Sequence, residues 1–257
     1  MGRVEIPPDH PRAEALRIRE RLVRGFEEGY VVPQGLIAHG RGEAFDYLLG
    51  ERTIPPARRA IRAAAAAFHL AERPVISVNG NVAALCPDEL VELSEVTGAP
   101  LEVNLFHRTE ERARRIRRVL EEAGARNVLG VDRGHLTRLP NLSSRRGIVD
   151  ERGIRRADFV LVPLEDGDRT RALKELGKRV AAIDLNPLSR TARDADITIV
   201  DNVVRCVRKI AREYENMDKE RAREVLEAYD NDAVLAEVLE YISRRLRVLA
   251  DEDAGES

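Results

Sequence analysis

Short apolar segments alternate along the chain with longer segments in which apolar residues recur at helical spacing. The short segments are bounded by charged residues, Gly or Pro, which is typical of buried strands. The predicted strands are residues 74–79, 101–105, 127–131, 158–163, 179–184 and 197–200. Strands that alternate with helices favour a parallel sheet covered on both faces. We therefore predict an α/β, Rossmann-like fold with a mostly parallel sheet of about six strands and helices on both faces.

Helical segments are predicted at both ends of the chain. The first begins at Pro11, which suits the first turn of a helix, and ends near Glu28 because Gly29 follows. A second begins near Pro55 and contains an alanine-rich run with high helix propensity. The stretch from Asn202 to about residue 250 is also predicted to be helical.

The last of these helices carries an apolar stripe at heptad spacing. Its members are Leu235, Leu239, Ile242, Leu246 and Leu249. The stripe can pack against the sheet of its own chain, or it can pair with the same helix of a second copy in a homodimer. The pattern alone leaves both alternatives open.

A chain of 257 residues, 43% of them hydrophobic, can form one large α/β domain. We predict a single domain over 1–257, with N-terminal helices and a glycine-rich loop in 1–72, the sheet core in 73–201 and C-terminal helices in 202–257. Residues 132–157 are polar and rich in arginine. We expect a long excursion with little regular structure there, and long loops in compact domains are often functional.

The composition excludes several classes of protein. A net charge of −2 disfavours a general nucleic-acid binder, because such proteins are usually basic. No segment reaches the roughly 20 apolar residues that a membrane-spanning helix needs. The first residues lack the apolar stretch of a signal peptide. We therefore expect a soluble cytoplasmic protein that binds neither nucleic acid nor membrane.

The segment from Gly35 to Asp46 concentrates candidate chemistry. Three glycines in twelve residues predict a loop whose backbone N–H groups can approach a ligand closely, followed by one or two helical turns over 43–49. The guanidinium of Arg41 suits a phosphate or carboxylate, because it can donate two parallel hydrogen bonds. His39 is a candidate general base or phosphate ligand, although a histidine among glycines is more often a structural hydrogen-bonding residue.

Three polar segments follow directly after predicted strands: 79–81, 164–170 and 184–190. Ligands of parallel sheets bind beyond the carboxyl ends of the strands, so we expect all three segments at one edge. Asn79 and Asn81 can bind a hydroxyl, sugar or phosphate, or they can form an ordinary strand-to-helix turn.

The second and third of these segments carry carboxylates. Asp166 and Asp168 are candidate ligands of Mg²⁺, which is usually bound through one or two carboxylates plus substrate phosphates. They can equally cap the next helix and face solvent. Asp184 closes a strand, where an acidic residue often accepts hydrogen bonds from a ribose. Asn186 and Arg190 follow in the same loop.

Two common nucleotide fingerprints and the familiar nucleophile sets are missing from the sequence. There is neither Gly-x-Gly-x-x-Gly, which disfavours a nicotinamide dehydrogenase, nor a P-loop. No Ser-His-Asp or Cys-His set is readable, so covalent catalysis receives little support.

Several long motifs together resemble one family. These motifs are residues 35–48, 50–53, 75–85, 163–170 and 183–190, which include Ala-His-Gly-Arg-Gly-Glu, Val-Asn-Gly-Asn-Val, Leu-Glu-Asp-Gly-Asp-Arg-Thr and Asp-Leu-Asn-Pro-Leu-Ser-Arg. They closely resemble the archaeal phosphopantothenate synthetase family, the 4-phosphopantoate–β-alanine ligases. The likeness runs from Ile6 to the final helix and is poorest in 132–157 and after Asp251.

The resemblance implies a reaction. ATP, 4-phosphopantoate and β-alanine would give 4′-phosphopantothenate, AMP and diphosphate through an acyl-adenylate, within coenzyme A biosynthesis. The resemblance also implies a homodimer, and the polyphosphate substrate makes Mg²⁺ an expected companion of ATP.

The resemblance further implies site residues. The ATP site falls on Arg19, Arg41, Asp184, Leu185, Asn186, Arg190, Thr191, Asn202 and Val203. Arg41 and Arg190 are the candidate catalytic residues, because they would neutralise the triphosphate. The spacing of the residues, rather than the resemblance, predicts where 4-phosphopantoate binds: its phosphate on Arg52 or Arg108, and its hydroxyl or carboxylate near Asn79 and Asn81, with His39 as a further candidate.

Two other functions stay open at this point. One is a different nucleotide-dependent carboxylate ligase or transferase on the same fold. The other is a regulatory protein that senses ATP without turnover.

Overall fold

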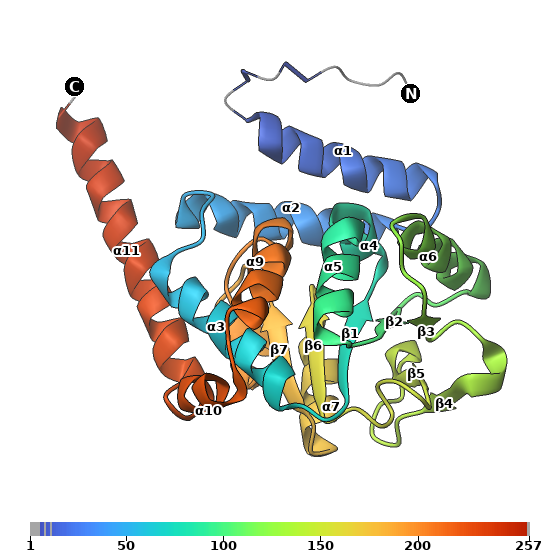
Figure 1. The fold of residues 1–257 in the computed structure, drawn as a ribbon. Helices are drawn as coiled ribbons and strands as arrows, with labels where there is room; N and C mark the ends of the chain where they lie inside the picture. Colours follow the sequence, from blue (N-terminus) through green and yellow to red (C-terminus); the bar gives the residue numbers. More distant parts are fainter. Residues whose placement is uncertain (1–5, 8, 11, 256–257) are drawn as a thin grey trace.

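A six-stranded parallel sheet forms the centre of the molecule (Figure 1). The computed structural model describes residues 6–7, 9–10 and 12–255. The strands are β1 (Pro74–Val78), β2 (Leu101–Val103), β3 (Val128–Leu129), β6 (Phe159–Pro163), β7 (Arg179–Ile183) and β8 (Ile197–Ile199), in the order β3-β2-β1-β6-β7-β8. All five neighbouring pairs are parallel, so the predicted α/β fold is confirmed.

Helices connect these strands and extend the chain at both ends. They are α1 (Ala13–Glu27), α2 (Pro33–Leu49), α3 (Pro55–Leu70), α4 (Gly80–Leu85), α5 (Pro87–Thr97), α6 (Glu110–Glu122), α7 (Gly167–Glu175), α8 (Arg190–Asp194), α9 (Val203–Glu215), α10 (Lys219–Glu227) and α11 (Asn231–Gly255). Pro11, the predicted helix start, lies outside the described residues.

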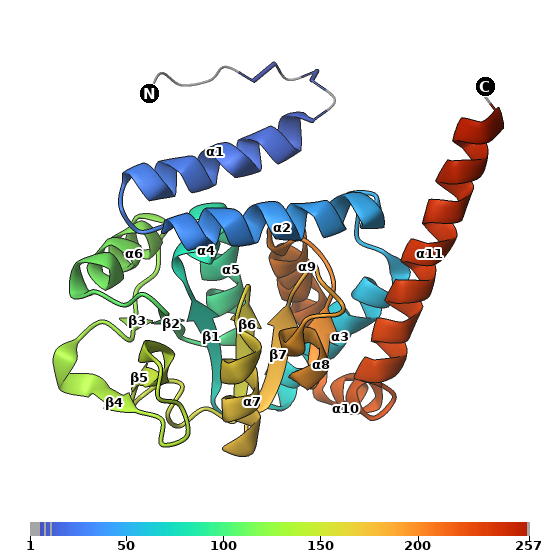
Figure 2. The same cartoon turned by 180° about the vertical axis from the view of Figure 1, so that it is seen from behind.

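Alternate residues of each strand pack against opposite layers, as side chains of period two require. Phe159 and Leu161 belong to the larger core, together with residues of α3, α4, α5 and α9. Val160 and Val162 belong to a second core with α7 and residues of the 132–157 segment. Figures 1 and 2 show these two layers on the two faces of the sheet.

The glycine-rich segment is helical, so the predicted loop over 35–42 is wrong. Pro33 occupies the first turn of α2, and Gly50 ends the helix with φ +80°. The lower helix propensity of the glycines is overridden by packing, because Leu49 is buried and Asp46 forms an ion pair with Arg205 of α9. The result is a helix that crosses above the carboxyl ends of the central strands (Figure 1).

The arginine-rich segment contains more regular structure than expected. An antiparallel pair, β4 (Leu136–Arg138) and β5 (Ile148–Asp150), joins two short 3-10 turns, η1 (Arg133–His135) and η2 (Arg145–Gly147). The buried Glu102 carboxylate of β2 holds this segment, because it accepts hydrogen bonds from the backbone N–H groups of Asp150 (2.8 Å) and Ile154 (2.6 Å). Buried backbone groups need such partners, and the pattern of apolar residues does not reveal them.

Only part of the heptad stripe of α11 packs against its own chain. Leu235 and Ile242 are buried against α2, α3 and α8 in a third apolar cluster. Leu239, Leu246 and Leu249 are exposed, and the C-terminal part of α11 extends away from the sheet (Figure 1). Across the described residues, we find no helix with the length and apolarity needed to cross a bilayer.

The burial of Glu102 gives a testable pH dependence. Burial raises the pKa of this carboxyl to about 7, whereas the pKa in an unfolded chain is about 4.3. Between these values the folded state keeps a proton that the unfolded chain has released, so stability falls as the pH rises through this window. The loss should amount to roughly 3 kcal/mol, measured by urea unfolding at several pH values.

The control is Glu102→Gln, which cannot ionise. This variant should lose most of that slope, whatever its overall stability. An unchanged slope in the variant would show that another group causes the pH dependence.

Candidate functional site

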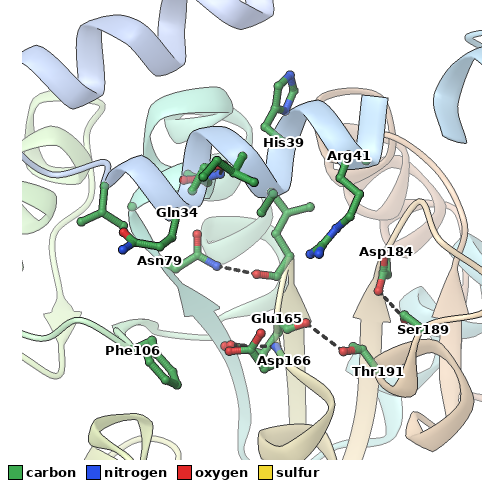
Figure 3. A pocket seen from close by; sticks show the side chains of 18 of the residues that line it. Gln34, His39, Arg41, Asn79, Phe106, Glu165, Asp166, Asp184, Ser189 and Thr191 are labelled. Carbon is green, nitrogen blue, oxygen red and sulfur yellow. Dashed lines mark hydrogen bonds between the residues drawn. The ribbon is translucent and has the colours of Figure 1, made fainter. Parts of the chain in front are cut away.

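A cavity of about 740 Å³ lies between α2 and the carboxyl ends of β1, β6 and β7 (Figure 3). It is placed at the point where the strand order reverses, between β1 and β6, which is where open α/β sheets bind ligands. All three predicted post-strand segments, 79–81, 164–170 and 184–190, contribute to its wall. The predicted edge of the sheet is therefore confirmed as a place where they meet.

Asn79 holds the two halves of the sheet together at this point. Its amide nitrogen donates to the carbonyls of Pro163 (3.1 Å) and Leu164 (3.0 Å), and its oxygen accepts from Val82 N and caps α4. Asn81 donates to the carbonyl of Gly35 (2.8 Å) and links α4 to α2. Both amide nitrogens and the Asn79 oxygen are thus used within the chain, which favours the strand-to-helix-turn interpretation of this motif.

The β7 end of the cavity is built around Asp184. Its two oxygens accept from Asn186 N (2.9 Å) and Ser189 Oγ (2.5 Å), and burial raises its pKa. Leu185 and Asn186 line the cavity beside it. A carboxylate has about four acceptor positions, so Asp184 can still accept a hydroxyl donor from a ligand.

The start of α8 completes this end. Ser189 Oγ accepts from Ala192 N and caps the helix, and Thr191 Oγ1 donates to the carbonyl of Glu165 (2.8 Å). Gly167 lies so close to α8 that an added Cβ would stand 2.5 Å from Arg190 Cβ. The glycine therefore allows the start of α7 to approach Arg190, whose side chain is 75% exposed and pairs with Asp168 (3.2 Å).

Arg41 reaches into the cavity from α2, on the side of Asp184 (Figure 3). It is exposed, and it forms no hydrogen bond or ion pair with the residues that the structure describes. His39 is among the residues that line the cavity, and in Figure 3 its ring lies on the other side of α2 from Asp166 and Asp184. Its Nε2 is buried without a partner among the described residues, and burial lowers the pKa of the ring. Burial therefore favours the neutral form of the His39 ring.

The opposite end of the cavity carries arginines that the sequence did not single out. Arg112 of α6 donates to the carbonyls of Tyr30 (2.8 Å) and His107 (2.9 Å), and burial lowers its pKa. Arg146, from η2, lies 5.7 Å from the ring centre of Phe106. Both guanidinium groups line the cavity, together with His107.

A buried ion cluster fixes Arg146. The side chain of Glu165, 1% exposed, bridges Arg146 and the fully buried Arg169 of α7. Arg169 in turn donates to Ser77 Oγ of β1 (2.9 Å). Because removing charges from water is costly, this cluster is weak evidence for stability and stronger evidence for fixed geometry.

Three predicted residues lie outside the cavity. Arg19 of α1 pairs with Glu43 (2.9 Å) on the outer side of α2. Arg52 donates to Tyr241 Oη (3.1 Å) beside α11. Arg108 is buried and donates to the carbonyl of Gly130 (2.6 Å). Neither Arg52 nor Arg108 lines this cavity, so the structure does not bring them to the place where we expect the substrates.

Four further predicted residues lie near the starts of α9 and α7, and only one of them lines the cavity. Asn202 caps α9 and donates to Asp46 Oδ2 (3.1 Å), and Val203 is buried beside it, so neither lines the cavity. Asp166 lines the cavity and Asp168 does not. Each of these two carboxylates already faces an arginine, and the described residues contain no group of three or more His, Cys, Asp or Glu side chains that could hold a metal ion.

The sequence missed Arg112, Arg146 and Phe106 for a physical reason. Arg112 reads as one of many arginines of an amphipathic helix, and Arg146 as one of seven in a polar segment. Only the fold brings α6 and η2 to the strand ends. The Glu165-x-x-x-Arg169 spacing at the start of α7 was the available signal for an ion pair.

Comparison with known proteins shows the family of this chain. The family model described as phosphopantothenate/pantothenate synthetase matches residues 56–245. A 4-phosphopantoate–β-alanine ligase of Thermococcus kodakarensis is 54% identical over 97% of this chain and 96% of its own length. Enzymes with the same name from Methanosarcina mazei (51%, covering 96% and 98%) and Methanospirillum hungatei (46%, covering 96% and 100%) are also similar. The chain belongs to the phosphopantothenate synthetase family.

Proposed function

We propose that this protein is an ATP-dependent ligase that condenses 4-phosphopantoate with β-alanine and releases AMP and diphosphate, as a cytoplasmic step of coenzyme A biosynthesis. The names of the relatives support it. The observation that carries it is one cavity with an acidic, hydroxyl-lined end at Asp184 and a second, arginine-rich end at Arg112 and Arg146, with Arg41 and Arg190 also in its wall. Such a cavity suits two anionic substrates held end to end.

The chemistry follows from charge and position. A carboxylate oxygen of 4-phosphopantoate attacks the α-phosphorus of ATP, the bond to the β-phosphate oxygen breaks, and diphosphate leaves. The amine of β-alanine then attacks the acyl carbon of the adenylate, and AMP leaves. Both first-step reactants are anions, so Arg41 and Arg190 would offset their repulsion. Neither step needs a nucleophilic side chain, because orientation and charge stabilisation suffice.

We assign the two ends of the cavity to the two phosphorylated substrates. Adenosine would lie at Asp184, Leu185, Asn186 and Thr191, with the ribose donating to the carboxylate. The phosphate of 4-phosphopantoate would meet Arg112 and His107. Arg112 Nη2 has no partner among the described residues and retains solvent access. It lies close to Gly80, where an added Cβ would stand 2.8 Å from this nitrogen. Arg19, Asn202 and Val203 remain implied for ATP by the family resemblance alone.

Mg²⁺ would reach this site bound to the triphosphate. Asp166 and Asp168 face Arg146 and Arg190, so they are a poor fit for a metal ion held by the protein. Neither proposed step therefore involves a metal ion held by these carboxylates.

We also propose that two copies pair through the exposed part of α11. Leu239, Leu246, Val248 and Leu249 are 39% to 52% exposed and lie on one helix. Burying such residues stabilises an assembly by roughly 25 cal/mol per Å² of apolar surface.

The first experiment identifies the products. Incubation with ATP, Mg²⁺, 4-phosphopantoate and β-alanine should yield AMP, detected by chromatography. ADP would contradict the adenylate route. Equal turnover of unphosphorylated pantoate would contradict the phosphate site and favour another carboxylate ligase. Tight ATP binding without any product would favour an ATP sensor.

The second experiment tests the arginines. Arg41→Ala and Arg190→Ala should each reduce kcat/KM by about a hundredfold or more, because each removes a charge-assisted contact of on the order of 2–4 kcal/mol. Their melting temperatures should stay near that of the unmodified protein, since both side chains are exposed. Arg193→Ala, on the exposed side of α8, is the matched control and should keep full turnover. Unimpaired turnover in both test variants would remove the site assignment.

The third experiment tests the pairing of α11. The double variant Leu246→Glu with Leu249→Glu should be monomeric by light scattering, because carboxylates would be buried in the interface. Phe26→Glu, an exposed position on α1, should remain dimeric. A dimer that survives the α11 substitutions would place the interface elsewhere.

A further inference from the structure

The cavity presents three carboxylates, of which one is engaged on both sides by arginines and one lies at the end proposed for adenosine. Glu165 lies between Arg146 and Arg169 with a side chain that is 1% exposed. Asp184 accepts from Asn186 N and Ser189 Oγ, and it lies at the end proposed for adenosine. Asp166 differs from both, because its side chain is 59% exposed.

Asp166 stands at the N-cap position of α7, yet its side chain does not cap the helix. The carboxylate turns toward the cavity instead, where Oδ2 lies 3.1 Å from Arg146 Nε. Oδ1 has no hydrogen-bond or ion-pair partner among the described residues. An aspartate at this position would ordinarily satisfy the helix N–H groups. Its orientation therefore leaves a negatively charged oxygen available to a ligand.

Arg146 offers the complementary charge beside it. Nη1 is held by Glu165 and Nε faces Asp166, whereas Nη2 retains solvent access. The side chain is 11% exposed, and the ring of Phe106, itself exposed, lies next to the guanidinium. An available oxygen and an available N–H group thus lie side by side in the cavity wall, with an apolar surface close to them.

We infer that Asp166 and Arg146 bind the amine substrate as a zwitterion, with its ammonium on Asp166 and its carboxylate on Arg146 Nη2. A short ω-amino acid carries a positive charge at one end and a negative charge at the other, which complements the negative Asp166 and the positive Arg146. Phe106 would cover the methylene groups between the two charges. This inference rests on the proposed ligase function. The inference assigns a binding place to β-alanine, which neither the sequence motifs nor the names of the relatives do.

The position suits the second step of the reaction. Asp166 immediately precedes Gly167, which allows α7 to approach Arg190 at the nucleotide end, while Phe106 lies on the other side (Figure 3). The ammonium bound to Asp166 loses one proton to water, because water reaches this half-exposed carboxylate. The amine forms the C–N bond as the bond between the acyl carbon and the adenylate oxygen breaks, and the second proton also leaves to water.

The two half-reactions allow a separate test. Asp166→Asn keeps the size of the side chain and removes its charge. We expect the KM for β-alanine to rise about tenfold or more, since a charge-assisted contact is worth at least about 1.4 kcal/mol. Exchange of labelled diphosphate into ATP, which needs 4-phosphopantoate but no β-alanine, should stay within about threefold of the unmodified protein.

The controls separate a binding role from a structural one. Asp232→Asn makes the same substitution at an exposed position of α11, outside the cavity, and should leave the KM for β-alanine unchanged. Asp166→Glu retains the charge and should recover part of the affinity. β-Alaninamide, which lacks the carboxylate, should be a poor substrate of the unmodified protein because it cannot engage Arg146.

Two outcomes would overturn the inference. One is an unchanged KM for β-alanine in Asp166→Asn. The other is an equal loss in the exchange reaction, which would assign Asp166 to the first step or to a metal ion. Absence of exchange in the unmodified protein would instead refute the proposed function, so the two failures are distinguishable.

Discussion

The parallel register of six strands is the constraint on which the rest of the structure depends. It brings the carboxyl ends of β1, β6 and β7 to one edge, and the reversal of strand order between β1 and β6 opens a crevice there. Asn79 bonds across this crevice to Pro163 and Leu164 and fixes its width. Residues that are more than a hundred positions apart in the sequence consequently meet in one cavity.

Buried charge gives this cavity its fixed geometry. Glu165 and Arg169 are almost entirely withdrawn from water, and a buried pair of this kind seldom adds net stability. Together with Ser77, the pair holds Arg146 in one position beside Asp166. Arg41 differs from Arg146, since it is exposed and has no partner among the described residues. One end of the cavity is thus preorganised, while the charge contributed by α2 can adapt to a triphosphate.

The helix α2 shows how packing overrides local preference. Its glycines reduce helix propensity, yet Pro33 starts the helix, Gly50 ends it, and Asp46 anchors it to Arg205 of α9. Helix formation places His39 and Arg41, two residues apart, on different faces of α2. A loop would not have imposed that separation of roles.

The sequence by itself determined the α/β class, the six strands and the polar segments after them, because apolar periodicity and turn residues are local signals. It also determined the family, through long motifs that cover nearly the whole chain. Only the tertiary structure decided which arginines reach the cavity: it removed Arg52 and Arg108 and introduced Arg112 and Arg146. A guanidinium looks the same in every surface helix, and its role depends on which carboxylates, carbonyls and strand ends the folded chain brings to it.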